Sequence, residues 1–460
     1  MQQLTAIILA AGRGTRMKSP LPKVLHPVAG EPMIIRILKN LKKAGVTESR
    51  VVVGYAQNLV KQVIEPLGVG VYVQSSQNGT ADAVRAAQPE SIEGDILIIN
   101  GDHPLIDGDE IAALIKTFNE EKQDLAVVSC ELKNPKDFGR IIRRNGDLVT
   151  IVEAKDASME TLKVREINTG IYIVKAKVLN EYLPQIQNKN AKQEYYLTDL
   201  ISLAIEGQEK VQALKTKSKK IAFGVNSMRE LALANKFAYA DNCRKLMDSG
   251  VMILDPQHTY IESTVEIGSG SVIYPNVHLR GSTKIGSFVV LEPQCYVVDS
   301  TIGNSIQVRA GSYIEKSKIS DKASVGPYAR LRPETEIGES AHVGNFVEFK
   351  KVKFGKGSKA GHLTYLGDAE IGEDVNIGCG TITCNYAVDK KKYKTKIGDR
   401  VFVGSDSQFV APVSVGPDAI IGSGSTITKD VPANALGIAR AKQTVIEGYA
   451  ERLKKKNEQE

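Results

Sequence analysis

The first residues whose types and spacing can do chemistry form a glycine-rich turn near the start of the chain. The turn is Gly12-Arg-Gly-Thr-Arg-Met17, and its cations Arg13 and Arg16 are followed by Lys23. Backbone N–H groups of such a turn approach phosphate oxygens closely, and the cations neutralise a triphosphate. A dinucleotide fingerprint is excluded because Met17 replaces its third glycine, and a Walker A loop because no Gly-Lys-Ser/Thr follows. Spacing alone leaves phosphate binding and a plain tight turn equally open.

A carboxylate in Asn100-Gly-Asp-His-Pro-Leu105 is the second candidate group. Asp102 follows the apolar run Ile96–Ile99, which predicts a buried strand, and ligands of an open α/β sheet bind at the carboxyl ends of its strands. A carboxylate beside phosphates indicates Mg²⁺, which takes one or two protein oxygens and completes its shell with water and phosphate. An aspartate that caps the next turn is the alternative.

A histidine in Lys359-Ala-Gly-His-Leu-Thr-Tyr365 is the third candidate. A neutral imidazole near pH 7 takes a proton from an amine that attacks a thioester, and hydrogen-bond donors then stabilise the oxyanion that forms. Other polar side chains gather in the same part of the chain: Arg332, Lys350, Tyr365, Asn376, Asn385 and Tyr386. The alternative for His362 is a surface histidine without a catalytic role.

The elements that position His362 repeat every six residues. Apolar residues keep this spacing, with two five-residue steps, at Ile267, Ile273, Leu279, Ile285, Leu291, Val297, Ile302, Val308, Ile314, Ile319, Val325, Leu331, Ile337, Val343 and Phe349, and again at Ile397, Val403, Phe409, Val415, Ile421 and Ile427. A period of six predicts a parallel β-helix, in which each hexad makes one short strand and one corner and three hexads close a coil. Chance clustering in a β-sandwich is the alternative, but sandwich strands keep no fixed period.

The hexads break twice, and we expect the second site at these breaks. Phe354 and Ile371 are 17 residues apart, one short of three hexads, and Ile377 and Ile397 are 20 apart, two too many. Interruptions of a solenoid are where loops leave its surface, and loops carry function.

The elements around the first two candidates alternate between strand and helix over residues 4–130, as a parallel α/β sheet requires. Apolar runs predict strands at Ala6–Ala11, Val51–Val53, Val71–Val73, Ile96–Ile99 and Leu125–Val128, and the spacing of apolar residues predicts helices at Met33–Leu41 and Ala81–Ala87. A further helix over Met228–Met247 joins the domains or is the last helix of the first domain.

Length, charge and cysteine content bound the class of protein. A chain of 460 residues exceeds one core, and its net charge of +7 fits an anionic small-molecule substrate or mere solubility without indicating nucleic acid. Five scattered cysteines without a CxxC favour a reduced cytosolic setting, and the run Leu4–Ala11 is too short for a membrane span.

The glycine-rich turn and its surroundings resemble a known family. Leu9-Ala-Ala-Gly-Arg-Gly-Thr-Arg-Met17 followed by Leu21-Pro-Lys-Val24 is similar to the signature of sugar-phosphate nucleotidyltransferases. From there to Arg440 the chain resembles the bacterial bifunctional N-acetylglucosamine-1-phosphate uridyltransferases and glucosamine-1-phosphate N-acetyltransferases. Further matching stretches are Phe138-Gly-Arg-Ile141, Val152-Glu153, Glu166-Ile-Asn-Thr-Gly170, Glu194-Tyr-Tyr-Leu-Thr-Asp199 and Gly224-Val-Asn226.

The resemblance implies an α/β Rossmann-like nucleotidyltransferase domain followed by a left-handed parallel β-helix (hexapeptide repeat) domain. We expect the nucleotidyltransferase (pyrophosphorylase) domain at residues 1–227, a helical linker at 228–250, the acetyltransferase domain at 251–437 and a C-terminal tail at 438–460. The family is also cytoplasmic and trimeric through the β-helix, so we expect a homotrimer that acts on small molecules, binds no nucleic acid and has no membrane span.

For the first site the resemblance implies roles residue by residue. The UTP and UDP-N-acetylglucosamine site comprises Leu9, Ala10, Ala11, Gly12 and Lys23 along the nucleotide, Gln74, Gly79 and Thr80 at its uracil and ribose, and Asn100, Gly101 and Asp102. The sugar is held by Gly139, Glu153 and Asn168, Mg²⁺ is bound by Asp102 and Asn226, and Arg16 and Lys23 stabilise negative charge on the transferring phosphorus.

For the second site the resemblance implies that His362 is the general base of the acetyl transfer. The amino-sugar phosphate is gripped by Arg332, Lys350, Tyr365 and Asn376. Acetyl-CoA is bound by Cys379, Asn385, Tyr386, Ser405, Ser423 and Arg440.

The chain departs from the family pattern in a few places. Ala81 and Asp82 stand where the family usually has Gly-His, which bears on the geometry of the nucleotide loop. The loop Asn385-Tyr-Ala-Val-Asp-Lys-Lys-Lys-Tyr393 is one residue longer than usual, reaches a neighbouring subunit in the family, and offers Lys390, Lys391 and Lys392 to the phosphates of CoA. At Cys379, Ser423 and Asn100, which replace Ala, Ala and Tyr, we expect little effect.

The implied activity is a sequence of two transfers. Glucosamine 1-phosphate is first acetylated by acetyl-CoA, and the product then attacks the α-phosphorus of UTP, with Mg²⁺ as cofactor and pyrophosphate as leaving group, to give UDP-N-acetylglucosamine for envelope synthesis. Three alternatives stay open: a monofunctional nucleotidyltransferase trimerised by its β-helix, a zinc hydratase with three converging histidines, and a scaffold without activity.

Overall fold

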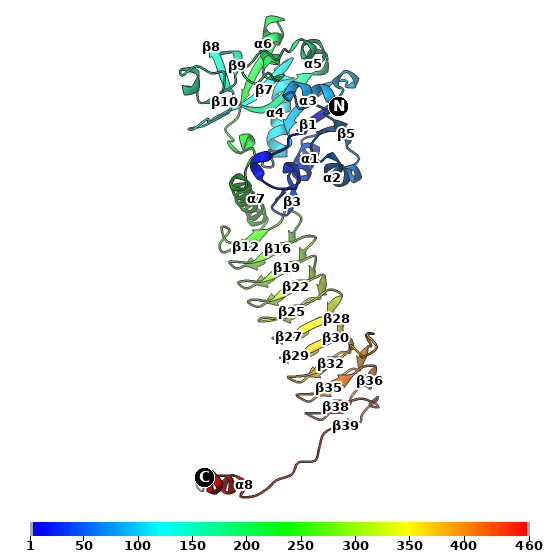
Figure 1. Ribbon diagram of the computed structural model, residues 1–460. Helices are drawn as coiled ribbons and strands as arrows, with labels where there is room; N and C mark the ends of the chain where they lie inside the picture. The colour runs from blue at the N-terminus through cyan, green and yellow to red at the C-terminus, as the bar shows by residue number, and fades with distance from the viewer. Residues whose placement is uncertain (1–2, 458–460) are drawn as a thin grey trace. The chain divides into compact units, whose positions relative to one another are not determined.

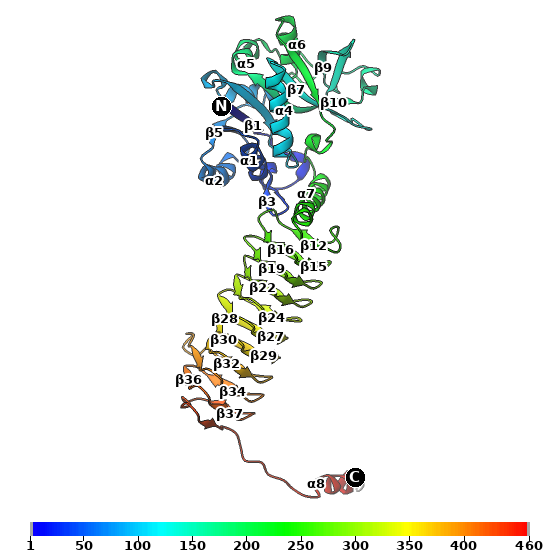
Figure 2. The ribbon, with the colours of Figure 1, turned by 180° about the vertical axis from the view of Figure 1, so that it is seen from behind.

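The computed structural model describes residues 3–457 and groups the chain into two compact units, Met1–Tyr239 and Ala240–Glu460. Figure 1 and Figure 2 show the elements of both units from opposite sides. The finer division at residues 227, 250 and 437 stays a prediction, and residues 1–2 and 458–460 of the predicted segments lie outside the described residues.

Unit 1 is built on one sheet of nine strands with the order β11-β7-β10-β6-β1-β4-β5, and the hairpin of β8 and β9 lies beside β10. Its strands are β1 (Leu4–Ala10), β4 (Glu48–Val53), β5 (Gly70–Val73), β6 (Asp95–Asn100), β7 (Leu125–Glu131), β8 (Arg140–Arg144), β9 (Asp147–Val152), β10 (Glu166–Lys175) and β11 (Val211–Lys215), with a separate ribbon of β2 (Pro27–Val28) and β3 (Glu31–Pro32). Apart from the hairpin, neighbours run parallel except at β10, which is antiparallel to β6 and β7. The five predicted strands and the α/β class are confirmed.

Helices cover both faces of this sheet. One face is covered by α1 (Met33–Lys43), α2 (Gln57–Ile64) and α4 (Gly108–Glu120), and the other by α3 (Thr80–Ala86), α5 (Ala176–Tyr182) and α6 (Asp199–Glu206). Successive residues of a central strand enter opposite cores, since Ile98 packs in one and Ile99 in the other. Because both faces are buried, the strands are continuous apolar runs rather than alternating ones.

The strand order places the first candidate residues together. The chain turns to β4 on one side of β1 and to β6 on the other, so the carboxyl ends of β1 and β6 flank a crevice. Leu9 pairs with Asn100 in register, and the N–H of Gly101 donates to the carbonyl of Leu9 at 2.8 Å. The glycine-rich turn after β1 therefore lies next to the segment of Asp102 after β6.

The predicted joining helix is α7 (Met228–Asp248), and the division between the units falls within it. Its first half packs in unit 1, where Ala234 and Ala238 are buried against Met33. Its second half packs in unit 2, where Cys243 is buried and the Asn242 Nδ2 donates to the Ile261 carbonyl at 2.8 Å. The helix thus contributes to both cores.

Unit 2 is a parallel β-helix of short strands, followed by α8 (Tyr449–Asn457). One face is a sheet of 11 strands: β12 (Met252–Ile253), β15 (Val272–Ile273), β18 (Val290–Leu291), β21 (Gln307–Val308), β24 (Ser324–Val325), β27 (His342–Asn345), β29 (Lys359–His362), β31 (Asn376–Ile377), β34 (Phe402–Val403), β37 (Ile420–Ile421) and β39 (Leu436–Gly437). The other faces join into a sheet of 17 strands: β13 (Tyr260–Ile261), β14 (Glu266–Ile267), β16 (His278–Arg280), β17 (Lys284–Ile285), β19 (Tyr296–Val298), β20 (Thr301–Ile302), β22 (Tyr313–Glu315), β23 (Ser317–Ile319), β25 (Arg330–Leu331), β26 (Thr335–Ile337), β28 (Glu348–Phe354), β30 (Tyr365–Ile371), β32 (Ile382–Cys384), β33 (Thr395–Ile397), β35 (Gln408–Val410), β36 (Val413–Val415) and β38 (Thr426–Ile427).

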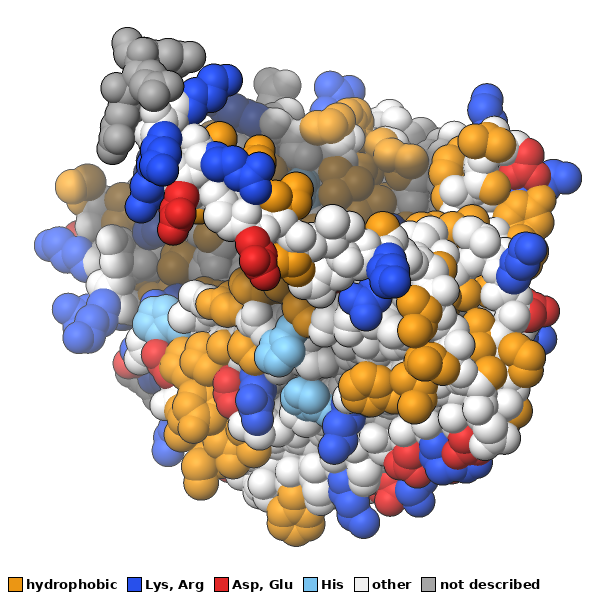
Figure 3. All heavy atoms as spheres, turned by 90° about the horizontal axis from the view of Figure 1, so that it is seen from below, with side chains coloured by type: hydrophobic (Ala, Val, Ile, Leu, Met, Phe, Trp, Pro, Cys, Tyr) orange, Lys and Arg blue, Asp and Glu red, His pale blue; other side chains and the backbone are white. Residues whose placement is uncertain are grey.

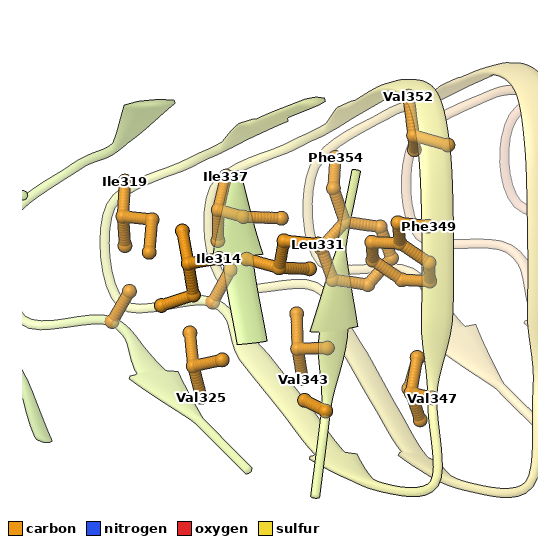
Figure 4. Packing of buried hydrophobic residues seen from close by; sticks show 14 of the residues in the cluster. Ile314, Ile319, Val325, Leu331, Ile337, Val343, Val347, Phe349, Val352 and Phe354 are labelled. Carbon is orange, nitrogen blue, oxygen red and sulfur yellow. The ribbon is translucent and has the colours of Figure 1, made fainter. Parts of the chain in front are cut away.

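The pairing register confirms that three hexads make one coil. Ile261 pairs with Leu279 and Leu279 with Val297, so each residue stacks on the residue three hexads away. Every predicted hexad residue is buried except Ile267, which is partly buried against the same core. Figure 4 shows part of this core, where the side chains between Ile314 and Phe354 point into the coils and pack on one another.

The first predicted break in the hexads is wrong. Between Phe354 and Ile371 the coil continues through β29 and β30, and these two residues pair in register. Ala360 and Leu366 take the inward positions and are fully buried. The repeat is hidden in the sequence because a small alanine with Gly361 and His362 after it does not show the expected aliphatic-glycine pattern.

The second predicted break is an inserted loop. Ile377 pairs with Val403 rather than with a residue three hexads later, so the coil contains extra residues. The loop leaves the coil after Cys384, and an isolated bridge between Tyr386 and Lys392 closes it. This loop is the one that the sequence showed to be longer than in the family.

We expect a truncated coil residue to destabilise unit 2. Ile319→Ala removes buried methyl groups from the stacked core and should cost about 2–5 kcal/mol of unfolding free energy, because neighbouring coils cannot collapse into the space. Lys318→Ala, the adjacent exposed residue, should change it by less than about 0.5 kcal/mol. Denaturant unfolding followed by circular dichroism measures the unfolding free energy of both variants. Equal effects would contradict the assignment of Ile319 to the inside of the coil.

Candidate active sites

A cavity of about 320 Å³ opens at the carboxyl ends of β1 and β6. Ten of the predicted nucleotide-site residues line it: Leu9, Ala10, Ala11, Gly12, Lys23, Gln74, Gly79, Thr80, Asn100 and Asp102. A side chain at Gly101 would be crowded, because a Cβ there would stand 3.1 Å from the Leu9 carbonyl oxygen and 3.2 Å from the Ala10 Cβ. The volume is in the range of small-molecule sites.

Four predicted polar residues meet at one edge of this cavity. The Lys23 Nζ donates to the Asp102 Oδ2 at 2.5 Å and to the Asn226 Oδ1 at 3.1 Å. The Arg16 Nη2 donates to the same Asn226 oxygen at 2.9 Å. The N–H of Val225 donates to the Asp102 carbonyl at 2.9 Å, which holds the segment before α7 against the segment after β6.

Asp102 is held in its ionised form. Burial pushes the pKa of this carboxyl up, but the positive charge of Lys23, its hydrogen bond and other neighbouring groups together outweigh burial, and the pKa lies below its usual value. Burial lowers the pKa of the neighbouring His103, so this imidazole stays neutral beside the Lys23 ammonium. The site therefore combines one carboxylate with two cations and an amide oxygen.

The glycine-rich turn lies closely against Lys23. Gly14 has a φ of +60°, and a Cβ there would stand 2.8 Å from the Lys23 Cβ, so only glycine permits this approach. Met17, which excluded the dinucleotide fingerprint, is buried in a small core and anchors the turn. Arg13 is exposed and does not line the cavity.

Sequence reasoning missed Gln77 in the nucleotide loop. Its Nε2 donates to the Ala11 carbonyl at 2.7 Å, and this contact ties the loop after β5 to the turn after β1. The nucleotide loop departs from the family pattern at two residues. Ala81 is fully buried, and Asp82 accepts a hydrogen bond from Gln74. The position of Gln77 between two predicted nucleotide residues was the only signal available in the sequence.

A second cavity of about 180 Å³ contains the predicted sugar residues Gly139, Glu153 and Asn168. It shares Leu9, Thr80 and Asn100 with the first cavity. The N–H of Asn168 donates to the Gly139 carbonyl at 2.9 Å, which fixes the hairpin of β8 and β9 beside β10. The two cavities therefore form adjoining parts of one site.

Glu153 has a carboxyl whose pKa is raised. Burial is the main cause, and Lys192 and a hydrogen bond from Thr198 offset it only in part. The Thr198 Oγ1 donates to the Glu153 Oε1 at 3.4 Å. A buried carboxylate is costly until donors satisfy it, and sugar hydroxyls supply such donors.

In unit 2, predicted residues of the sugar phosphate lie on the long strands β28 and β30. Lys350 pairs in register with Gly367. A Cβ at Gly367 would stand 2.5 Å from the Tyr365 Oη and 2.8 Å from the Asn385 Nδ2, so the glycine leaves room for both groups. The Asn385 Nδ2 donates to the Asp368 Oδ2 at 2.5 Å, which fixes the root of the inserted loop.

Three cations converge on this surface. Contact with the Lys392 ammonium lowers the pKa of Lys350, and the charge of Arg332 lowers it further. The Arg332 Nη1 donates to the Glu348 Oε1 at 2.8 Å, which orients the guanidinium. Grouped like charges repel one another, and a dianionic phosphate relieves this repulsion. Sequence reasoning offered Lys392 only to the phosphates of CoA, because loop closure could not be read from the residues.

His362 lies at the head of a row of predicted coenzyme residues. It ends β29 and is exposed, and its backbone pairs with Asn345 of the coil before. The register of Ala360 with Ile377 then places Cys379 beside His362 one coil later. The same corner of later coils holds Ser405, Ser423 and Arg440, linked by hydrogen bonds from Asp406 N–H to the Cys379 carbonyl and from Gly424 N–H to the Ser405 carbonyl.

Two predicted residues stand apart from these groups within one chain. Asn376 lies on β31, in the sheet of β29, whereas Lys350 and Tyr365 lie in the other sheet. Tyr386 is 62% exposed on the inserted loop. Within one chain these two residues therefore do not join the groups to which the sequence assigned them.

Exposed apolar side chains precede the coenzyme row at the same corner. Tyr328, Phe346 and Leu363 are more than half exposed on successive coils, and the Tyr328 and Phe346 rings stack with centroids 5.7 Å apart. Figure 3 shows apolar patches among lysine and arginine side chains on the surface in that view. Isolated apolar residues are ordinary on a surface, but a row of them is typical of an interface.

Among residues 3–457, no three His, Cys, Asp or Glu side chains are placed to hold one metal ion, so the three-histidine set of a zinc hydratase is not formed there. None of the helices in the described part of the chain is long and apolar enough to cross a membrane.

Comparison with known families defines the class of each unit. Residues 6–145 match the MobA-like NTP transferase domain, residues 256–354 match the GMPPB C-terminal domain, and residues 394–429 match the bacterial transferase hexapeptide (six repeats). A solved structure of a putative glucose-1-phosphate thymidylyltransferase from Bacillus anthracis aligns with 51% of this chain and 95% of its own at 22% identity, with a TM-score of 0.42. A nucleotidyltransferase unit is thus followed by a hexapeptide-repeat transferase unit.

Full-length relatives define the family. The chain is 64% identical over 457 residues to bifunctional protein GlmU of Bdellovibrio bacteriovorus, with 99% of this chain and 100% of the relative covered. It is 44% identical over 447 residues to bifunctional protein GlmU of Carboxydothermus hydrogenoformans, with 97% and 100% covered. The chain belongs to the bifunctional GlmU family. It is an enzyme of UDP-N-acetylglucosamine synthesis, which transfers an acetyl group from acetyl-CoA to glucosamine 1-phosphate and a uridylyl group from UTP to the product.

We expect the buried Glu153 to lower the stability of unit 1 at neutral pH. Because its pKa is raised, folding favours its protonated form, and the ionised form destabilises the folded state above the ordinary carboxyl pKa. Glu153→Gln should therefore raise the thermal unfolding temperature of the ligand-free protein at pH 7, and the gain should shrink as the pH falls towards the ordinary glutamate value. Glu160→Gln, at an exposed position, should change neither the unfolding temperature at pH 7 nor its dependence on pH. A gain that is equal at all pH values would contradict the prediction.

Proposed function

We propose that the adjoining cavities of unit 1 are the uridylyltransferase site. UTP lies along the glycine-rich turn with its base and ribose at Gln74, Gly79 and Thr80, and the sugar contacts Gly139, Glu153 and Asn168. The observation that carries this proposal is the meeting of Lys23, Asp102 and Asn226 at one edge of the nucleotide cavity.

The reaction in this site needs position and charge rather than a protein nucleophile. A phosphate oxygen of N-acetylglucosamine 1-phosphate attacks the α-phosphorus of UTP, and the bond from that phosphorus to pyrophosphate breaks. Arg16 and Lys23 hold negative charge on the phosphates as it shifts to the leaving group. Both cations are already oriented by the Asn226 oxygen, so little reorganisation is required.

The same group of residues fits Mg²⁺. Asp102 offers an ionised carboxylate and Asn226 an amide oxygen. Both oxygens contact the Lys23 ammonium, so their arrangement already accommodates one positive charge. Asp102 and Asn226 would hold the ion, which when bound supplies positive charge to the phosphate oxygens.

We propose that unit 2 carries the acetyltransferase site. His362 takes a proton from the amine of glucosamine 1-phosphate as the nitrogen forms a bond to the acetyl carbon, and the bond from that carbon to sulfur breaks to release CoA. Arg332, Lys350 and Tyr365 hold the sugar phosphate, with Lys392 as an additional cation. Acetyl-CoA lies along the row from Cys379 through Ser405 and Ser423 to Arg440, and its sulfur faces the head of the row.

The active enzyme is proposed to be a homotrimer joined through the β-helix. Support comes from the separate positions of Asn376 and Tyr386, which a neighbouring chain would complete, and from the exposed apolar row at Tyr328, Phe346 and Leu363. Five free cysteines and the use of UTP and acetyl-CoA support a cytoplasmic setting.

Two substitutions should separate the two reactions. Asp102→Asn removes a charge from the phosphate site and should lower pyrophosphate release from UTP and N-acetylglucosamine 1-phosphate by about 10²-fold or more, with acetyl transfer unchanged.

His362→Ala removes the proposed base and should lower acetyl transfer by about 10²- to 10⁴-fold, with pyrophosphate release unchanged. A coupled phosphate assay and a free-thiol assay measure the two rates.

Matched variants control for general damage to each unit. Asp109→Asn and His258→Ala change exposed side chains of the same kinds in the same units and should leave both rates within about twofold. Equal acetyl transfer by the wild type and His362→Ala would overturn the assignment of the base.

The trimer has its own test. Light scattering on the eluting protein should give three times the 49.9 kDa of one chain. Leu363→Lys places a charge in the exposed apolar row and should lower the mass or raise the concentration needed for assembly, whereas Lys318→Glu should not. A monomeric wild type with full acetyl transfer would refute the proposal.

A further inference from the structure

Asp82 lies next to the part of the nucleotide cavity that the proposed function assigns to the base. It lies in the first turn of α3, and its Oδ2 accepts a hydrogen bond from the Gln74 Nε2 at 2.7 Å. Gln74 and Gly79 line the cavity, whereas Asp82 does not. Any effect of Asp82 on a nucleotide therefore passes through Gln74.

The partners of the Gln74 amide allow it only one orientation. Its nitrogen donates to the carboxylate of Asp82 and, at 3.3 Å, to the carbonyl oxygen of Gly79. A carboxylate and a carbonyl only accept hydrogen bonds, so both demand the amide nitrogen. A flipped amide would bring the Gln74 oxygen against two other oxygens and lose both bonds. The oxygen of Gln74 is consequently the atom that this arrangement leaves for a ligand.

The Gln74 side chain is held in place by its surroundings. Gln74 is 7% exposed, and its loop is tied on one side by the bond from Gln77 to Ala11. On the other side, the N–H of Ala81 donates to the Tyr195 carbonyl at 2.9 Å, which fixes the start of α3. Both ends of the Gln74–Asp82 contact are therefore held by the fold.

We propose that Asp82 is a positioning residue that sets the choice of base. It holds the Gln74 amide so that the oxygen accepts from the N3–H of uracil and opposes the N3 lone pair of cytosine. The proposal rests on the proposed role of Gln74 at the uracil, and it adds the reason why that amide selects one pyrimidine.

The carboxylate matters because it makes the reverse orientation unfavourable. To accept cytosine, Gln74 must either leave its oxygen facing a lone pair or flip and lose a charge-assisted bond to Asp82, and each choice costs about tenfold or more in kcat/KM. An asparagine at position 82 has nearly the same shape, but its amide presents either an oxygen or a nitrogen. Both orientations of Gln74 then have a partner at position 82, and only the longer contact to the Gly79 carbonyl still favours the original one.

The test is the ratio of kcat/KM for UTP over CTP in pyrophosphate release by the full-length enzyme. Asp82→Asn should lower this ratio by about tenfold or more through a gain with CTP, while kcat/KM for UTP stays within a few-fold. Asp82→Glu keeps a group that only accepts and should retain a ratio close to that of the wild type. Gln74→Ala should lose discrimination together with UTP affinity.

The outcomes separate this proposal from the function on which it rests. A wild-type ratio in Asp82→Asn, alongside a lowered ratio in Gln74→Ala, overturns the positioning role and keeps Gln74 as the base reader. A loss of the ratio in both Asp82→Asn and Asp82→Glu assigns Asp82 a role in loop shape and also overturns the proposal. A wild type that releases no pyrophosphate from UTP would instead overturn the uridylyltransferase site itself.

Discussion

Parallel strand register is the constraint on which both sites depend. In unit 1 the pairing of β1 with β6 sets Leu9 beside Asn100, and the turn and the carboxylate that follow these strands must then meet. In unit 2 the same kind of pairing repeats once per coil and sets residues of successive coils in one row. A parallel ladder fixes the spacing along a row, and apolar burial on the inner side fixes which residue points inward.

The two sites use this constraint with different chemistry. In unit 1, Asp102 stays ionised because the Lys23 ammonium and other neighbouring groups outweigh its burial, and these charges converge beside the glycine-rich turn. In unit 2, Arg332, Lys350 and Lys392 gather, and Glu348 forms an ion pair with Arg332, so that surface carries an excess of positive charge. Neither arrangement needs a protein nucleophile, which agrees with transfers that depend on position and on the removal of one proton.

The free protein carries charged groups whose surroundings are unfavourable to their charge. Glu153 is buried with its pKa raised, and the three cations of unit 2 repel one another. Asp82 differs from these groups because its partner, the Gln74 amide, is already in place, so its contribution is made before any nucleotide arrives. Such preorganisation lowers the cost of ordering the site during binding.

Much of the architecture could be predicted from the residues alone. The period of six determined the β-helix and its inward side chains, because each hexad must bury one apolar residue at a fixed place, and the apolar runs determined the central strands of unit 1. The coil between Phe354 and Ile371 was mistaken for a break because Ala360 is small enough to disguise the pattern.

Tertiary structure decided the contacts between distant segments. No spacing relates Lys23 to Asn226, and only the docking of the segment before α7 against the segment after β6 brings them within hydrogen-bonding distance. Likewise Lys392 joins Lys350, and Asp82 holds Gln74, only because a closed loop and a docked helix carry them there. Sequence determined which residues face the cores, since burial follows a local period, whereas side-chain partners follow from packing that no local period encodes.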